Sequence, residues 1–209
     1  MYKNFVKRLI DLVLSACGII VLTPVWLILA IAIKIDDPGP ILFKQKRIAQ
    51  DKNGQKHCFQ IYKYRSMKMC APKDCPTHLL DNPEQYITKV GGFLRKTSLD
   101  ELPQLYNIFL GSMSIIGPRP ALWNQDDLYA KRAKYGANAV KPGLTGWAQI
   151  NGRDELPIDV KAKLDGEYVE KMSFAFDVKC FLGTITSVLK HEGVVEGGTG
   201  AIEKEEAKK

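Results

Sequence analysis

The longest apolar stretch of the chain covers residues 9–33, where nearly every side chain is hydrophobic. As a straight helix this stretch would be roughly 37 Å long, which is enough to cross a bilayer. Pro24 predicts a kink in its middle, and the hydroxyl of Thr23 can bond back to a carbonyl of the preceding turn. Basic residues flank both ends, which places both on the cytoplasmic side. We therefore favour a re-entrant helix-break-helix over a single spanning helix.

Charged residues lie just before this segment and in its first turn. Lys7, Arg8 and Asp11 have i,i+3 and i,i+4 spacing. We expect them to form a local group at the membrane interface, which would make the buried carboxylate tolerable.

A breaker cluster at residues 36–40 ends the apolar segment and predicts a boundary. The pattern then predicts a β-hairpin, with strands at 41–48 and 57–65 and a turn at 51–54. Lys63 and Arg65 share one face of the second strand and could hold phosphate, although a solvated strand edge is an equal alternative.

The clearest helix pattern lies at residues 102–110. Its apolar positions recur at helical spacing, which predicts one core-facing stripe of Leu102, Leu105, Tyr106, Phe109 and Leu110. Further helices are expected at 123–135, 158–172 and 177–190. The last of these has a second stripe that we also expect in the core, formed by Val178, Phe181, Leu182, Ile185 and Leu189.

Two adjacent carboxylates, Asp100 and Glu101, come directly before the helix predicted at 102–110. Ser98 and Glu101 have the spacing of a capping box, and Asp100 would serve equally well as the N-cap. Either arrangement places the pair near the positive end of a helix, where a phosphate is stabilised. A purely structural capping role is the alternative.

Three separated arginines are candidates for clamping a phosphate. Arg95 precedes the acidic pair, Arg119 lies between Pro118 and Pro120, and Arg153 follows a glycine-rich stretch at 141–152. A guanidinium held in place can bind phosphate through two parallel hydrogen bonds. The glycines would allow close approach of the backbone to a ligand. For Arg119, an ordinary turn arginine is an equal alternative.

Composition limits the partners and the compartment. The 209 residues carry a formal charge of +7, which indicates an acidic partner: nucleic acid, an anionic membrane surface or a phosphorylated substrate. Five cysteines at irregular spacing argue for a reducing compartment. Cys70, Cys75 and His78 lack a nearby fourth ligand, which argues against structural zinc.

The expected fold class is α+β, a mostly helical catalytic domain with a small β-hairpin and an N-terminal re-entrant membrane helix-break-helix. The expected divisions are a membrane-associated segment at 1–35, a cytoplasmic catalytic domain at 36–196 and a disordered tail at 197–209.

Several motifs together, in this order, resemble the bacterial initiating sugar-1-phosphate transferases, the small monotopic phosphoglycosyl transferases. The resemblance extends from Phe5 to about Val194. It rests on Lys7-Arg8-Leu9-Ile10-Asp11, Tyr62-Lys63-Tyr64-Arg65-Ser66-Met67, residues 95–105, Gly117-Pro118-Arg119-Pro120, Pro142-Gly143-Leu144-Thr145-Gly146-Trp147 and Asn151-Gly152-Arg153. Family members often have Ser-Pro at the helix break, where this chain has Thr23-Pro24.

The resemblance implies an enzyme that moves a sugar 1-phosphate from a UDP-sugar to polyprenyl (undecaprenyl) phosphate and releases UMP. It would act at the cytoplasmic face of the bacterial inner membrane, among membrane lipids, in the first membrane step of polysaccharide or glycoconjugate synthesis. Asp100 would be the nucleophile that forms a phospho-Asp intermediate and would also bind Mg²⁺, and Glu101 would complete the pair. Substrate contacts would come from Arg95, Arg119 and Arg153, with Lys63 and Arg65 as further candidates.

Other functions remain open from the sequence. A metal-dependent pyrophosphate hydrolase would use the same groups, and a basic membrane-docking module would use Asp100 and Glu101 only as a cap. Nucleic-acid binding is not expected, because no recognised motif is present. The sugar, the glycan pathway, the role of Glu101 and the oligomeric state, a dimer included, are not determined by the sequence.

Overall fold

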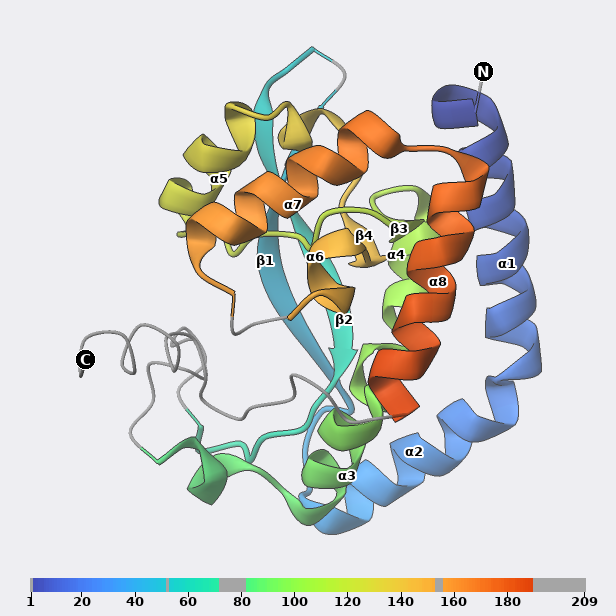
Figure 1. Ribbon diagram of the computed structural model, residues 1–209. Coiled ribbons are helices and arrows are strands. Elements are labelled where there is room, and N and C mark those ends of the chain that lie inside the picture. Colours follow the sequence, from blue (N-terminus) through green and yellow to red (C-terminus); the bar gives the residue numbers. More distant parts are fainter. Residues whose placement is uncertain (1, 52, 72–81, 153–155, 190–209) are drawn as a thin grey trace.

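The N-terminal apolar stretch folds as two helices, α1 (Lys7–Val21) and α2 (Thr23–Asp36), in the computed structural model of the chain (Figure 1). The structure describes residues 2–51, 53–71, 82–152 and 156–189. The two helices are bent by 61°. Pro24 lies in the first turn of α2, and Thr23 Oγ1 donates to the carbonyl of Ile19 at 2.8 Å. The predicted break at Thr23-Pro24 is therefore confirmed. Among the described residues, only the bent pair together, and neither helix alone, has the length and apolar character of a candidate membrane span.

The predicted hairpin is present as the antiparallel pair β1 (Leu42–Gln50) and β2 (Lys56–Tyr64). The carboxylate of Asp51 accepts the backbone N–H groups of Asn53 and Gln55, which closes the turn. Gly54 completes it with a φ of 82°, a value that favours glycine.

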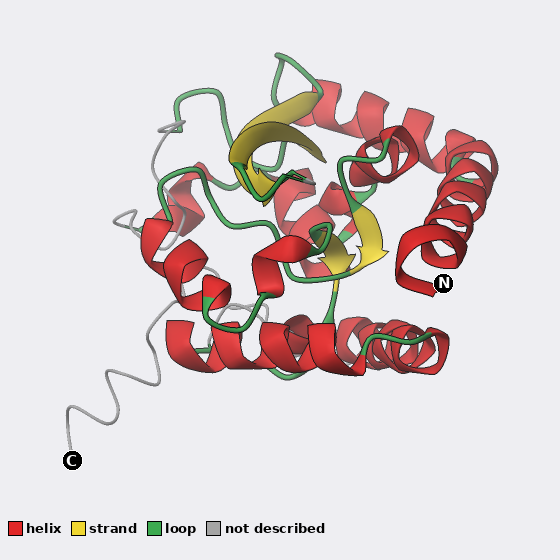
Figure 2. Cartoon of the chain, turned by 90° about the horizontal axis from the view of Figure 1, so that it is seen from above, coloured by secondary structure: helices red, strands yellow, loops and turns green. Residues whose placement is uncertain are grey.

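Helices are the main elements in the rest of the described chain. They are α3 (Lys89–Thr97), α4 (Gln104–Leu110), α5 (Asp126–Ala133), α6 (Trp147–Ile150), α7 (Ile158–Lys171) and α8 (Phe174–Leu189). A second small sheet pairs β3 (Ser114–Ile116) with β4 (Gly143–Thr145) in parallel. Seen from above, the hairpin lies beside the N-terminal helices, on the side of the molecule opposite the layer of α7 and α8 (Figure 2). The fold is therefore α+β and mainly helical, as predicted, whereas α3 and the parallel pair were not anticipated.

Helix α2 packs directly on the part of the chain that follows it. Leu29 and Ile33 form a core cluster with Tyr64 of β2 and Leu94 of α3. One side of α2 thus belongs to the core, while Leu27, Ile28 and Ile31 on its other side are exposed. The predicted division at residue 36 stays a prediction.

The predicted core stripe at residues 102–110 is only partly correct, because Leu102 and Leu105 pack against core clusters whereas the other three positions are exposed. Helix α4 buries Gln104, Asn107 and Ile108, and it exposes Tyr106, Phe109 and Leu110. The reason is that Asn107 forms hydrogen bonds with the backbone of β2, and these bonds fix which face of α4 turns inward.

The predicted core stripe of α8 is wrong for the same kind of reason. Asp177 and Cys180 turn inward, where Asp177 takes part in a buried ion pair with α1. The apolar positions of the opposite face are between 39% and 57% exposed, namely Val178, Phe181, Leu182 and Ile185.

The three charged residues at the start of α1 do not form the expected local group. Lys7 Nζ lies 2.6 Å from a carboxylate oxygen of Asp177 in α8. Arg8 donates to the carbonyls of residues 108 and 109, at the C-terminal end of α4. Asp11 accepts the backbone N–H of Ile115 in β3 at 2.9 Å. The buried carboxylate of Asp11 is therefore satisfied by the core, not by its neighbours in the helix.

Two adjacent glycines of α3 provide a test of its packing. A Cβ on Gly91 would lie 2.0 Å from the carbonyl oxygen of Ser66, whereas a Cβ on Gly92 would meet only a methyl group at 3.9 Å. We expect Gly91→Ala to destabilise the chain by about 1–3 kcal/mol, because α3 must move away from Ser66. Gly92→Ala should be neutral or stabilise it by up to about 1 kcal/mol, because alanine favours helix. Denaturant unfolding of both variants in detergent is the measurement, and equal effects would contradict this packing.

Candidate active site

Asp100 and Glu101 lie in a short 3-10 turn, Leu99–Glu101, between α3 and α4. The predicted capping box is wrong. Ser98 ends α3 in the left-handed conformation (φ 57°), and its side chain makes no capping hydrogen bond. α4 begins only at Gln104, so the two carboxylates precede the helix and do not cap it. The turn instead directs them towards β2 and the segment after β3.

The carboxylate of Glu101 joins two cations from distant parts of the chain. One of its oxygens lies 2.7 Å from Lys63 Nζ in β2 and 2.8 Å from Arg119 Nη2, which follows β3. Arg119 Nη1 reaches the other oxygen at 3.4 Å. Lys63 also lies 3.9 Å from a carboxylate oxygen of Asp100. The structure therefore brings together four of the predicted site residues.

The two carboxylates differ in their electrostatic environment. Burial raises the pKa of Asp100 above its ordinary value; the charge of Lys63 acts against this shift, while the charge of Glu101 adds to it. Burial would also raise the pKa of Glu101, but Arg119 and Lys63 outweigh it and hold that pKa well below the ordinary range. Glu101 is thus held as an anion between two cations, and Asp100 is the carboxylate that is less strongly paired.

Arg95 and Arg65 have different surroundings, although both were predicted as phosphate contacts. Arg95 is one of the cations that act on the pKa of Asp100, and its Nε donates to the hydroxyl of Ser66 at 2.9 Å. Arg65 is buried, donates to the carbonyl of Pro40 and forms an ion pair with Asp37. The structure does not bring Arg65 to the acidic pair. Arg153 lies outside the described residues, as do Cys75 and His78.

Asn107 holds α4 against the strand that carries Lys63. Its side-chain oxygen accepts the N–H of Tyr62 at 3.0 Å, and its amide nitrogen donates to the carbonyl of Gln60 at 2.7 Å. One side chain thus bonds to β2 as a neighbouring strand would. This contact fixes the distance between Lys63 and the turn that carries Glu101.

The turn that carries Arg119 is held by close contacts between backbones. A Cβ on Gly143 would lie 2.1 Å from the nitrogen of Gly117, and a Cβ on Gly146 would lie 2.1 Å from its oxygen. Gly143 and Gly146 permit the close approach of two backbone segments, while the approach of a ligand to the glycine-rich stretch stays a prediction. Gly117 N–H donates to the carbonyl of Thr145 at 2.8 Å, which locks the turn.

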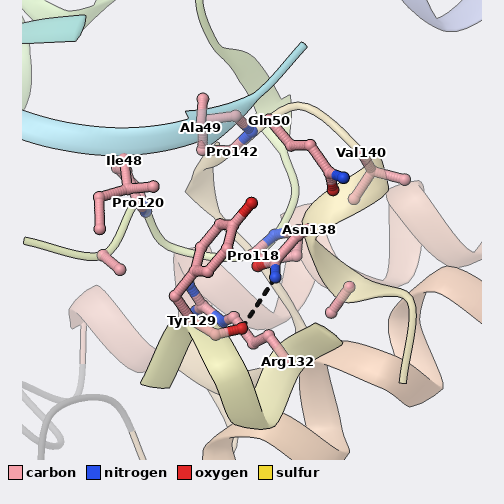
Figure 3. Close-up of a pocket in the computed structure, with 12 residues that line it drawn as sticks. Ile48, Ala49, Gln50, Pro118, Pro120, Tyr129, Arg132, Asn138, Val140 and Pro142 are labelled. Carbon is pink, nitrogen blue, oxygen red and sulfur yellow. Dashed lines mark hydrogen bonds between the residues drawn. The ribbon is translucent and has the colours of Figure 1, made fainter. Parts of the chain in front are cut away.

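A cavity lies between β1, α5 and the prolines on either side of Arg119 (Figure 3). Tyr129 of α5 extends its ring towards β1, and the Asn138 amide donates to the carbonyl of Tyr129 at 2.8 Å. None of the predicted site residues lines this cavity, so it is separate from the acidic pair.

The described residues contain no group of three His, Cys, Asp or Glu side chains arranged to hold a metal ion. Mg²⁺ commonly binds one or two protein carboxylates together with substrate phosphates. The carboxylate of Asp100 suits such a site, whereas that of Glu101 is already engaged by two cations.

The model of the family described as bacterial sugar transferase matches residues 2–191. The chain belongs to this family. It is 38% identical over 190 residues to a UDP-glucose:undecaprenyl-phosphate glucose-1-phosphate transferase of Escherichia coli, a match that covers 88% of the chain and 40% of that protein. It is also 39% identical to the uncharacterized sugar transferase EpsL of Bacillus subtilis, covering 90% of the chain and 89% of EpsL. The exopolysaccharide production protein PSS of Rhizobium leguminosarum is 35% identical, and the match covers 88% of the chain and 94% of PSS.

The chain therefore spans about two-fifths of the length of the E. coli relative and nearly the whole length of EpsL and PSS. The family resemblance drawn from the motifs is confirmed. Sequence reasoning missed Ser66 and Asn107, although a lone asparagine inside an apolar helix pattern is a signal that could have drawn attention to the second.

The charge of Glu101 makes a test of the site possible without substrate. A lowered pKa stabilises the fold above the ordinary value of 4.5, and this stability is lost as the pH falls through the folded-state pKa. We expect Glu101→Gln to be less stable than the unchanged chain at neutral pH, because Lys63 and Arg119 lose their anion. The difference should shrink as the pH falls below 4.5. Unfolding measured across pH checks this, and a difference that is independent of pH would contradict the ion pairs.

Proposed function

We propose that this chain transfers a sugar 1-phosphate from a UDP-sugar to polyprenyl phosphate, with Asp100 as the nucleophile. The observation that carries the proposal is the unequal pairing of the two buried carboxylates. Glu101 is engaged by Lys63 and Arg119, while Asp100 lies beside the same cations with its pKa raised. The name of the E. coli relative, which specifies UDP-glucose and undecaprenyl phosphate, supports this donor and acceptor class.

In the first step, a carboxylate oxygen of Asp100 attacks the phosphorus that carries the sugar. The bond between this phosphorus and the bridging oxygen breaks, and UMP leaves with that oxygen. In the second step, an oxygen of polyprenyl phosphate attacks the phospho-Asp group, which restores the carboxylate and yields the polyprenyl diphosphate sugar. Dividing one displacement into two in this way is typical of covalent catalysis.

The cations around the pair supply the stabilisation that phosphoryl transfer requires. An anionic nucleophile can approach a diphosphate only where positive charge is already in place. Arg119 keeps 30% of its side chain exposed beside Glu101, so it can contact a donor phosphate from the solvent side. Lys63, Arg95 and Arg153 are the further contacts in the proposal, and Arg65 is no longer among them. When bound at Asp100, Mg²⁺ would offset the charge of the diphosphate.

In this proposal Glu101 is not a general base, although it is adjacent to the nucleophile. A carboxylate held ionised by two cations is a poor general base, because its pKa is far below the operating pH. We propose that Glu101 holds Lys63 and Arg119 beside Asp100 and does not itself accept a proton.

The proposed location is the cytoplasmic face of the bacterial inner membrane, with α1 and α2 forming a re-entrant pair. The 61° bend and the basic residues at both ends support this arrangement. It would place the acidic pair close to the phosphate of an acceptor whose hydrocarbon tail stays in the lipid.

The nucleophile can be tested by trapping the intermediate. We expect the detergent-solubilised chain, incubated with Mg²⁺ and a panel of UDP-sugars without acceptor, to gain the mass of one sugar phosphate after rapid acid quench. Peptide mapping should place the addition at Asp100. Asp100→Asn should gain no mass and should lose at least about 1,000-fold in UMP release, because no covalent path remains.

Other outcomes would identify a different function. UMP release that survives Asp100→Asn would contradict the nucleophile, and release of inorganic phosphate without acceptor would indicate a hydrolase. If no UDP-sugar gave UMP with undecaprenyl phosphate present, a non-enzymatic membrane-docking module would be favoured.

The topology makes a separate prediction. A single cysteine introduced at Lys3 in a chain without other cysteines should resist membrane-impermeant thiol reagents in intact cells, because both ends of a re-entrant pair face the cytoplasm. Labelling after cell lysis is the control for accessibility. Labelling in intact cells would instead favour a spanning helix.

A further inference from the structure

A buried aspartate that does not belong to the acidic pair collects three donors from different elements. Asp177 of α8 accepts hydrogen bonds from the hydroxyls of Tyr2 and Tyr168 and forms an ion pair with Lys7 at 2.6 Å. Of these donors, Tyr2 precedes α1 and Lys7 is the first residue of α1. Asp177 is therefore the point at which the N-terminal helix is bonded to α8.

Tyr168 extends this cluster to the strand that leads to Arg119. Its side chain is almost fully buried, and its hydroxyl faces both Asp177 Oδ1 at 2.8 Å and the carbonyl of Ile116 at 3.1 Å. Ile116 is the last residue of β3, and only Gly117 and Pro118 separate it from Arg119. The hydroxyl of Tyr168 thus lies between the carboxylate that anchors α1 and the backbone that carries a proposed phosphate contact.

A second bond holds the same strand to α1. Asp11, one turn after Lys7, accepts the N–H of Ile115. β3 is therefore fixed to α1 at Ile115 and, through Tyr168 and Asp177, at Ile116. A shift of α1 relative to α8 would alter both attachments, and with them the position at which the turn after β3 presents Arg119.

We infer that Tyr168 and Asp177 are positioning residues that connect the placement of the N-terminal helix to donor binding through Arg119. The inference rests on the proposed function, because it takes Arg119 to contact the donor. It adds that α1 does more than attach the chain to lipid: its docking against α8 and β3 sets the geometry of the phosphate-binding turn.

Tyr2 supplies a matched control within the same cluster. Tyr2→Phe and Tyr168→Phe each remove one hydroxyl that donates to Asp177, but only Tyr168 also faces β3. With UDP-sugar as donor, we expect Tyr168→Phe to raise KM about two- to tenfold with kcat changed less than about twofold, which is the range for losing one hydrogen bond. Tyr2→Phe should change KM less than about twofold.

The route through Arg119 is tested by combining substitutions. In an Arg119→Lys background, Tyr168→Phe should raise KM by a further factor of less than about two. The reason is that the Arg119 side chain, which Tyr168 positions, is already replaced. A purely structural role would instead give the same increase in both backgrounds. Full additivity, or equal KM effects of Tyr2→Phe and Tyr168→Phe, would overturn the inference.

Amide hydrogen exchange gives a readout that needs no donor. Tyr168→Phe should speed exchange in residues 114–119 relative to the unchanged chain, whereas Tyr2→Phe should not. Equal exchange in all three proteins would overturn the positioning role. If the unchanged chain turned over no UDP-sugar, the proposed function would fail while the exchange measurement still decided whether Tyr168 holds β3.

Discussion

The site is held together by one carboxylate that three separate segments share. Glu101 lies in the turn after α3, Lys63 comes from the hairpin, and Arg119 follows β3. Both cations converge on the same oxygen of Glu101, at 2.7 and 2.8 Å. Because the three segments are far apart in the sequence, this shared anion ties them together at the site, in addition to the bonds of Asn107 and Tyr168. Removing it would take from two partly buried cations the carboxylate that they share, which costs more than the loss of a single surface ion pair.

The same arrangement explains why two adjacent acids can have different tasks. Each additional bond that Glu101 accepts makes it a weaker base and holds Lys63 and Arg119 more firmly in place. Asp100, one residue earlier, feels the same cations but is approached by Lys63 only at 3.9 Å. A nucleophilic carboxylate needs positive charge nearby so that an anionic substrate can approach. It must not itself be engaged in close ion pairs with those cations. In the proposed reaction the neighbouring glutamate would meet both needs, because it holds Lys63 and Arg119 near Asp100 and accepts bonds from both.

Local patterns predicted the elements of this chain well, because helix breaks, turns and alternating strands depend on a few adjacent residues. Thr23-Pro24 and the turn closed by Asp51 were recognised for that reason. The faces of α4 and α8 were not, because hydrophobicity alone assigned their apolar sides to the core. Buried polar groups decided otherwise: Asn107 turns α4 towards β2, and Asp177 turns α8 towards α1. The partners of these two residues lie in other elements, so no local pattern reveals them.

For the candidate site, the sequence predicted most of the residues but not how they pair with one another. The acidic pair, Lys63 and Arg119 were identified by residue type and motif, but the sequence could not show that Glu101 takes both cations. Arg65 was grouped with Lys63 because alternate residues share a strand face. The strand ends at Tyr64, however, and the next residue turns to Asp37.

The bonds between the chain's beginning and its last described helix have a consequence for folding. Tyr2 and Asp177 are 175 positions apart, and Lys7 and Asp177 are 170 apart. During synthesis Lys7 emerges long before Asp177, so the first turn of α1 cannot form this ion pair until about 170 further residues have been made. Contacts of such long sequence separation slow the folding of a domain, because a long loop must close before they can form. Helix α2, by contrast, packs on Tyr64 and Leu94, so its core contacts need much less of the chain than those of Lys7 do.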